Sequence, residues 1–286
     1  MRINHNISAM ITQGSLYSVN RDMSKSLEKL STGLRINRAS DDAAGLGVSE
    51  NLRTQVNGTA QASKNAQDGI AAITIAEGAA NEVSSILQRM RELAVQSSND
   101  TLTSVERSYT ESEFQALNSE IDRISNATNY NKQELLSTTA TRFGNGTAGS
   151  VLWVDANNTV GVDSVTITID TLTTSALSLS NAGGVSTTHL TDQTSSVTAI
   201  ATLDVAINSV NTMRSDMGAY INRLEHAINN LAVSNTNQQS AESLIRDVDF
   251  ATETSQFTRN QILTQSATAM LAQANQLPQS VLTLLR

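Results

Sequence analysis

The sequence predicts a mainly α protein with long antiparallel helices and a terminal coiled coil, and with a small insert that contains a β-hairpin. Apolar residues recur every three or four positions near both ends of the 286-residue chain, as they do on the face of a helix. Aromatic residues make up only 3% of the chain, which is too few for a conventional aromatic-rich core. A two-residue alternation of apolar and polar side chains, typical of strands, occurs only in the middle.

The first predicted helix begins close to the N-terminus and carries an apolar stripe. The members of this N-terminal stripe are Ile3, Ile7, Met10, Tyr17, Met23, Leu27, Leu30 and Leu34. The segment "TGLRINRASDD" interrupts the pattern. Ser40, Asp41 and Asp42 predict the cap and the acidic first turn of a second helix, because their side chains accept hydrogen bonds from free N–H groups.

The second predicted helix is long, and one of its faces is apolar along most of its length. The residues of that face are Ile70, Ile73, Ala76, Ala80, Val83, Leu87, Met90 and Ala94. The loop-forming segment "QSSNDTLTSVER" ends it, and Thr103 and Glu106 have the spacing of a capping box for a third helix. The apolar face of the third helix consists of Phe114, Leu117, Ile121 and Ile124.

The middle of the chain, from residue 138 to about residue 198, is rich in Ser, Thr and Gly. "SVTITID" alternates cleanly and places Val165, Ile167 and Ile169 on one face of a strand. "VLWVDANNTVGV" predicts a hairpin with "DANN" at its turn. Few residues of this insert have helical spacing, so we expect it to face outward.

Helical periodicity returns at Leu203 and lasts until the polar interval "SNTNQQSAES". The apolar residues of this helix are Ile207, Val210, Met217, Ile221, Leu224, Ile228 and Leu231. A last segment runs from about Ile245 to the end, and its apolar residues have the four-three spacing of a coiled coil. This C-terminal stripe consists of Leu263, Ala267, Met270, Ala274, Leu277, Val281 and Leu284. Pro278 lies inside it and predicts a bend or the end of the helix.

An antiparallel return of the chain would bring the C-terminal stripe against the N-terminal stripe. Both stripes include small or widely spaced residues, so their contact buries little apolar area. Ordering the two ends has a large entropic cost that this burial does not offset. We therefore expect other molecules to supply further apolar contacts.

Composition argues against several classes of function. The formal net charge of −8 disfavours binding to nucleic acid. No stretch approaches the roughly 18 apolar residues of a membrane span, and the stripes lack the basic faces of helices that bind a membrane surface. The start of the chain has no continuous apolar segment, so we expect export by a route other than an ordinary secretory signal.

No constellation predicts an enzyme, a cofactor or a metal site. The chain has no Cys. Asp247 and Asp249 are interpreted as a solvated helix start, because no His or third carboxylate lies at ligand spacing beside them. Gly45 and Gly47 lack the third glycine and the preceding strand of a nucleotide-binding loop, and they are interpreted as positions of close helix packing.

Long motifs stand at both ends of the chain. They include "INHNISAM", "LEKLSTGLRINRASDDAAGLGVSENLRTQ", "LQRMRELAVQSSND" and, at the C-terminus, "FATETSQFTRNQILTQSATAMLAQANQLPQSVLTLLR". In this order they resemble the two end regions of bacterial flagellin, the subunit of the flagellar filament. The resemblance covers roughly residues 1–137 and 203–286, and the middle of the chain lies outside it.

The resemblance implies three regions. These are an inner coiled-coil domain at 1–43 and 247–286, a helical second domain at 44–137 and 200–246, and a variable β-containing insert at 138–199. The insert is short, so the chain resembles a short form of the family with little outer-domain insertion. We expect the insert to be dispensable for assembly.

The implied function is a structural subunit that polymerises into the extracellular flagellar filament for motility, after export by the flagellar type III apparatus. The alternative is a hook–filament junction protein with flagellin-like ends. The implied partners are further copies of the chain, the flagellar cap and hook-junction proteins, and an export chaperone. Host toll-like and cytosolic flagellin receptors are candidate partners, whereas nucleic acid and membranes are not expected.

Two sets of site residues follow from the stripes and the resemblance. The expected polymerisation residues are Ile3, Ile7, Met10, Leu27, Leu30, Leu263, Met270, Leu277, Val281, Leu284 and Leu285. By motif match, Gln88, Arg89, Leu93 and Glu113 correspond to residues through which a toll-like receptor recognises such proteins. We expect Arg89 to be exposed and Leu93 to be intermediate, and we expect these residues to serve primarily in packing between subunits.

Overall fold

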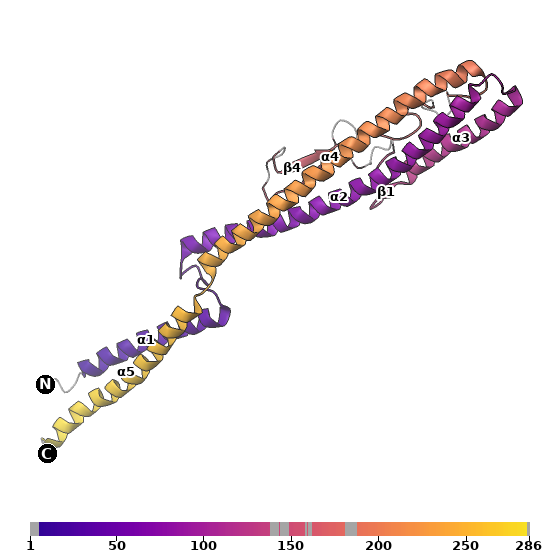
Figure 1. Ribbon diagram of the computed structural model, residues 1–286. Helices are drawn as coiled ribbons and strands as arrows, with labels where there is room; N and C mark the ends of the chain where they lie inside the picture. Colours follow the sequence, from indigo (N-terminus) through magenta and orange to yellow (C-terminus); the bar gives the residue numbers. More distant parts are fainter. Residues whose placement is uncertain are drawn as a thin grey trace. The chain divides into compact units, whose positions relative to one another are not determined.

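The computed structural model describes residues 6–137, 143, 149–157, 159, 162–180 and 188–284, with the side chains of the last helix described as far as Gln276. The helices are α1 (Ile7–Thr32), α2 (Ala43–Ser97), α3 (Ser104–Ala127), α4 (Gln193–Arg246) and α5 (Phe250–Leu284) (Figure 1). The strands are β1 (Asn129–Tyr130), β2 (Gln133–Glu134), β3 (Ser150–Trp153) and β4 (Ser164–Ile167). The prediction of a mainly α fold is therefore confirmed.

The chain divides into two compact units. Unit 1 consists of residues 1–54 and 236–286, and unit 2 consists of residues 55–235. Both boundaries fall inside helices, since α2 and α4 each contribute to both units. The division into three regions that the resemblance implies stays a prediction.

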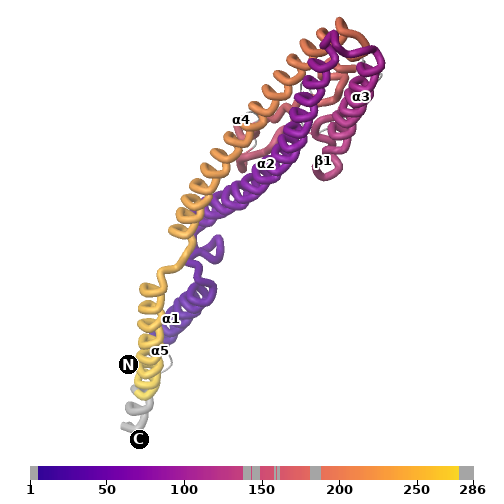
Figure 2. The backbone as a smooth tube through the Cα atoms, turned by 45° about the vertical axis from the view of Figure 1, so that its right-hand side comes forward, coloured from indigo at the N-terminus to yellow at the C-terminus, as the bar shows by residue number. Residues whose placement is uncertain are grey.

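In unit 1, α1 and α5 run side by side in opposite directions (Figures 1 and 2). At one end of the pair, the side-chain amide of Asn6 donates to the carbonyl oxygen of Ala274 at 2.8 Å. Toward the other end, Lys29 Nζ lies 3.8 Å from the carboxylate of Glu253. The expected antiparallel pairing of the two chain ends is thus confirmed.

The turn between α1 and α2 differs from its prediction. Gly33 ends α1 in the left-handed region with φ 73°, where glycine is favoured. The cap of α2 is Asp42 rather than Ser40, because Asp42 Oδ1 accepts from the backbone N–H of Gly45 at 2.8 Å. Asp41 instead accepts from the N–H groups of Arg38 and Asn37, which lowers the pKa of its carboxyl.

Unit 2 has an apolar core between α2, α3, α4 and the insert. The predicted face of α2 is confirmed, and its fully buried members are Ile73, Ala76, Ala80, Val83, Leu87, Met90 and Ala94. From α3 the core receives Phe114 and Ile121, and from α4 it receives Leu203, Val210, Met213, Met217 and Leu224. The predicted capping box of α3 is also confirmed, since Thr103 and Glu106 bond each other's backbone N–H groups.

Among the described residues, α2 is the helix that is long and apolar enough to cross a membrane by length and composition. The expectation from the sequence that no stretch of the chain approaches a membrane span therefore does not hold for α2. A core helix passes the same test. The buried positions of α2 recur along one face, as they do in a helix that packs against a protein core.

The hairpin of the insert pairs different strands from those predicted. Strand β3 pairs antiparallel with β4, with Ser150 opposite Ile167 and Trp153 opposite Ser164. The second strand is thus "SVTI", and "DANN" belongs to a longer connection. The alternating residues of β4 have an apolar face to bury, and Ile167 is fully buried, whereas Val162 of the predicted partner strand is 77% exposed.

A second hairpin, β1–β2, was not predicted from its residues. It places Asn129 opposite Glu134 and Tyr130 opposite Gln133. Asn131 and Lys132 form its two-residue turn with positive φ values of 50° and 65°. Such turns favour Asn, and the adjacent Lys gave no comparable signal.

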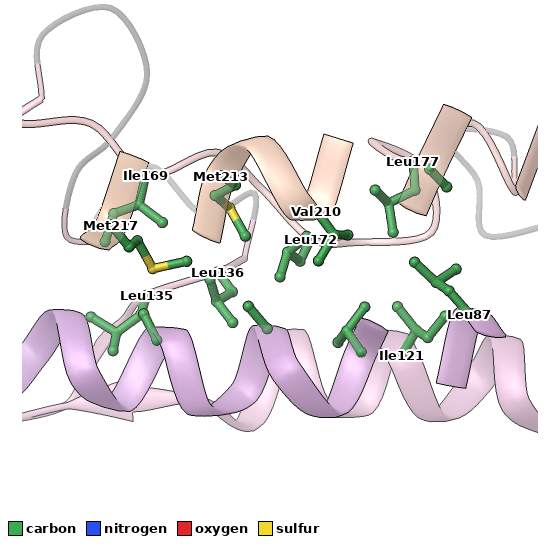
Figure 3. Close-up of a cluster of buried hydrophobic side chains, with 14 of the residues drawn as sticks. Leu87, Ile121, Leu135, Leu136, Ile169, Leu172, Leu177, Val210, Met213 and Met217 are labelled. Atoms are coloured by element: carbon green, nitrogen blue, oxygen red, sulfur yellow. The ribbon is translucent and has the colours of Figure 1, made fainter. Parts of the chain in front are cut away.

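The expectation that the insert faces outward is wrong. Ile169, Leu172, Leu177, Leu179 and Leu190 are buried in the core of unit 2. In Figure 3, Leu172 lies with Leu136 between α4 above and the helices below. The insert therefore fills space between α2 and α4 that the helices do not close themselves, and the sequence pattern does not reveal this because it shows only which face is apolar.

The last two helices also extend beyond their predictions. Helix α4 begins at Gln193, ahead of the expected start at Leu203, and it continues through the polar interval "SNTNQQSAES" to Arg246. Helix α5 continues past Pro278 to Leu284, so this proline does not end the helix. A bend at Pro278 stays a prediction.

Candidate assembly surface

The contact between α1 and α5 follows a regular three-four spacing that we call the intrachain seam. Its buried and half-buried positions on α1 are Ala9, Thr12, Leu16, Val19, Met23, Ser26 and Leu30. On α5 they are Glu253, Phe257, Asn260, Thr264, Ala267, Leu271 and Ala274. Many of these side chains are small or polar. The seam therefore has coiled-coil geometry but little of the large apolar bulk that stabilises a coiled coil.

A second set of apolar residues on the same helices stays exposed, and we call it the outer stripe. Its members are Ile7, Met10, Ile11, Tyr17 and Leu27 of α1, and Ile262, Leu263 and Met270 of α5. Tyr17 is 75% exposed and Met270 is 63% exposed. Exposed apolar side chains gathered on one pair of helices indicate a surface that another molecule covers.

These positions confirm only in part the prediction that the C-terminal stripe meets the N-terminal stripe. The members of the two stripes that do lie in the intrachain seam are Met23, Leu30, Ala267 and Ala274. Leu263 and Met270 are exposed, and the neighbouring residues Thr264 and Leu271 face α1 instead. One residue along a helix is a rotation of about 100°, so adjacent positions belong to different faces.

The expected polymerisation residues therefore separate into groups. Ile7, Met10, Leu27, Leu263 and Met270 belong to the outer stripe, and Leu30 belongs to the intrachain seam. The remaining ones lie outside the residues whose side chains are described. These are Ile3, Leu277, Val281, Leu284 and Leu285.

Ile11 and Ile262 of the outer stripe were not predicted from the sequence, and neither was most of the intrachain seam. Ile11 and Ile262 directly follow or precede predicted members, so a broader stripe would have included them. The seam positions of α5 were hard to recognise in the sequence, because the polar residues Asn260 and Thr264 interrupt their apolar pattern. Its spacing from Phe257 to Ala274 was nevertheless present in the sequence.

A shallow hollow on α5 adjoins the outer stripe. It is lined by Thr254, Ser255, Thr258, Arg259, Ile262 and Leu263. Ile262 and Leu263 give this hollow an apolar edge, while the hydroxyl groups and Arg259 provide hydrogen-bond donors. An open hollow with both apolar and hydrogen-bonding side chains is more typical of a contact with another protein than of a pocket for a small ligand.

The ends of α1 and α5 are held by polar contacts at the α1–α2 turn. Arg35 donates its backbone N–H to Arg246 O at 2.6 Å, and Val248 donates to Gly33 O at 3.0 Å. The guanidinium of Arg246 lies 2.7 Å from the carboxylate of Glu50. These contacts position the start of α5 against the end of α1.

Asp249 caps α5. Its carboxylate accepts from the hydroxyl of Thr252 at 2.7 Å and from the backbone N–H of Ala251 at 2.9 Å. These bonds lower the pKa of Asp249. The predicted interpretation of this aspartate as part of a helix start is confirmed.

In unit 2, three of the four predicted receptor residues come together on the surface. Arg89 Nε and Nη2 each lie 2.9 Å from Glu113 Oε1, and Arg89 Nη1 lies 3.0 Å from Glu92. The hydrogen bonds that Arg89 donates to Glu113 and to Glu92 raise the pKa of its guanidinium. Gln88, Arg89 and Glu113 are exposed, as predicted for Arg89.

The prediction that Leu93 is intermediate in exposure is wrong, because its side chain is buried and the residue is only 1% exposed. It lies on the same inner side of α2 as Met90 and Ala94, and it packs in the core of unit 2. Leu93 is therefore part of the core of unit 2 and not of the surface.

Across the described ranges, no group of three or more His, Cys, Asp or Glu residues could hold a metal ion. The features that stand out are the intrachain seam and the outer stripe of unit 1, together with a unit 2 that has its own core. These features define a helical structural protein with an uncovered coiled-coil surface.

Comparison with known proteins gives the family. The bacterial flagellin N-terminal helical region matches residues 3–141, and the bacterial flagellin C-terminal helical region matches residues 200–285. The chain belongs to the bacterial flagellin family.

Relatives match along the whole chain. A flagellar filament 33 kDa core protein of Treponema phagedenis is 47% identical over 290 residues, and a flagellin of Halalkalibacterium halodurans is 46% identical over 286 residues. Both alignments cover 100% of each chain. The crystal structure of Bacillus cereus flagellin is similar with a TM-score of 0.48 and 29% identity, covering 59% of this chain and 88% of that one.

Proposed function

We propose that this chain is the structural subunit that polymerises into the extracellular filament of a bacterial flagellum and so serves motility. The observation that carries the proposal is the outer stripe, which leaves large apolar side chains uncovered on both terminal helices. Copies of the chain packed around one another would cover it. Membership of a family of structural filament proteins supports the same conclusion.

Electron microscopy of the purified chain tests this function. After polymerisation is induced, we expect long filaments of uniform diameter. Amorphous aggregates, or a chain that stays monomeric under all inducing conditions, would argue against a filament subunit. The polymer should also redissolve into folded monomers, because the core of unit 2 does not depend on assembly.

The further partners are also part of the proposal. The chain needs no cofactor or metal and acts without catalysis, and it meets the flagellar cap and hook-junction proteins at the ends of the filament. An export chaperone would cover the outer stripe before assembly, since exposed apolar residues such as Met10 and Met270 favour aggregation. A complex of chaperone and chain should therefore fail to polymerise until the chaperone dissociates.

For host recognition, we propose that Gln88, Arg89 and Glu113 form the surface that a toll-like receptor contacts, while Leu93 maintains it from the core. Cytosolic flagellin receptors are a further proposed partner. The charged side chains of Arg89 and Glu113 are about half exposed and are held by their mutual hydrogen bonds, so they are already positioned for a partner. In the filament the same surface is expected to be covered by neighbouring subunits.

Receptor activation by the isolated monomer tests this assignment. Arg89→Asp reverses the charge and should weaken the response strongly. Arg123→Asp is the matched control, because Arg123 also forms an exposed ion pair, with Glu120. An equal loss in both variants, or no loss in the folded Arg89→Asp chain, would reject the assignment.

A further inference from the structure

Asn260 is an anomaly within the intrachain seam. It is only 4% exposed, yet its side-chain nitrogen has no hydrogen-bond partner. Phe257 precedes it in the seam and Thr264 follows it. A buried amide N–H without an acceptor destabilises the state in which it is buried.

The opposite helix offers no acceptor. The contacts Asn6–Ala274 and Lys29–Glu253 fix the register, so Asn260 lies opposite residues 19–23 of α1. The half-buried side chains there are Val19 and Met23, and neither carries an oxygen atom. No backbone carbonyl oxygen of this stretch accepts from the amide nitrogen of Asn260 either.

We propose that Asn260 acts as a brake on assembly, by keeping the pairing of α1 with α5 weak in the free chain. The proposal rests on the function proposed above, since it concerns when the subunit becomes competent to polymerise. A leucine at this seam position would add apolar contact and remove the unpartnered amide. In the free chain, Asn260 therefore shifts the equilibrium from the state in which α1 and α5 are paired toward the state in which they are unpaired.

The effect on assembly depends on the fraction of free chains in which α1 and α5 are paired. If only chains with paired ends can join a polymer, the apparent affinity of the free chain equals the affinity of the paired chain multiplied by the fraction that is paired. In the polymer, neighbouring copies cover the outer stripe and stabilise the paired state, so the polar residue is tolerated there. Asn260 thus acts on the timing of assembly through the pairing of α1 with α5 inside one chain.

The test combines two measurements on the full chain. For Asn260→Leu we expect the critical concentration for polymerisation to fall by up to about tenfold, because removing an unsatisfied buried donor raises the paired fraction of the free chain. Proteolytic cleavage within α1 and α5 of the free chain should slow measurably but by less than tenfold, because most wild-type ends are undocked and the unpaired fraction changes less than the paired fraction. Asn260→Gln keeps an amide at the site and should behave nearly like the wild-type chain.

Asn275→Leu is the matched control, because Asn275 is exposed on the same helix and the substitution changes helix propensity equally. It should leave cleavage unchanged. Unchanged or faster cleavage in Asn260→Leu would overturn the proposal, as would slower cleavage with an unchanged critical concentration. A wild-type chain that never polymerises would instead refute the proposed function, while the cleavage comparison would still report on Asn260.

Discussion

Unit 1 and unit 2 are both built from long helices, but they bury very different side chains. In unit 2, residues as large as Phe114, Leu87 and Met90 are fully buried. In the described part of unit 1, the buried apolar residues are Ile36 and Ala274. Isolated helices are marginal in water without an apolar face to pack, so unit 2 is stable by itself and unit 1 is conditionally stable.

The difference assigns separate roles to the two units. Unit 2 keeps its own core, to which the insert contributes Ile169 and Leu172. Unit 1 exposes the outer stripe and pairs its helices through a seam in which small and polar residues interrupt the half-buried apolar ones. A subunit with this division can stay folded in unit 2 as a monomer and still gain apolar contacts in unit 1 when copies of the chain assemble.

The largest effect is expected from charges in the outer stripe. Leu263→Asp combined with Met270→Asp should abolish polymerisation, because each carboxylate would be buried against a neighbouring copy. The melting temperature of unit 2 in the free chain should not change. Sedimentation of induced polymer measures the first effect, and thermal unfolding measures the second.

The control for this variant is Gln261→Asp with Thr268→Asp, which adds the same charge at exposed polar positions of α5. It should keep most of the polymer yield. Wild-type polymerisation by the Leu263/Met270 variant would show that the outer stripe remains in water within the filament.

The next effect concerns the insert. Leu172→Ala removes a fully buried side chain and should lower the free energy of unfolding of unit 2 by about 2–5 kcal/mol. Chemical denaturation of the monomer measures this loss. Val162→Ala, at a position that is 77% exposed, should change stability very little, and equal losses would contradict the core position of the insert.

The same packing revises the expectation that the insert is dispensable. Replacing residues 145–194 with a flexible linker would remove Ile169, Leu172, Leu177 and Leu190 from the core. We therefore expect the deletion to destabilise unit 2 and, through it, to reduce assembly.

A smaller effect is expected at the start of α3. Thr103→Ala removes the hydroxyl that accepts from the backbone N–H of Glu106, and it should destabilise unit 2 by about 1 kcal/mol. Thermal unfolding of the monomer would measure it. Ser112→Ala, on an exposed turn of the same helix, is a suitable comparison and should cost less.

The smallest effect is a dependence on pH. Hydrogen bonds from Thr103 lower the pKa of Glu106, so the folded state favours the ionised carboxylate. This contribution is fully present above the unfolded pKa of about 4.3 and is lost as the pH falls through the lowered folded value. Glu106→Gln should therefore flatten the acid limb of the unfolding curve of unit 2, and an unchanged limb would contradict the assignment.

Much of the fold follows from the sequence because large apolar residues recur at regular spacing. The face of α2 from Ile73 to Ala94 was predictable for this reason, as was the capping box at Thr103. The orientation of α5 was not, because Leu263 and Thr264 belong to competing stripes one residue apart. Periodicity identifies an apolar face, but it does not identify the molecule that the face contacts.

The insert teaches a similar lesson. The alternation at Val165, Ile167 and Ile169 correctly predicted a buried face, yet the hairpin partner and the packing between α2 and α4 depend on contacts distant in sequence. For the candidate receptor surface, the resemblance to flagellin grouped Arg89 with Glu113, which form an ion pair, while the burial of Leu93 required the packed structure.

Hydrogen exchange on the free chain and on the polymer compares the two units directly. In the free chain, amides of α1 and of residues 250–276 should exchange orders of magnitude faster than those of α2 from Ile73 to Ala94. Polymerisation should slow exchange strongly in the first group and change it little in the second. Terminal helices that are already as protected as α2 in the free chain, or that gain no protection in the polymer, would contradict the conditional stability of unit 1.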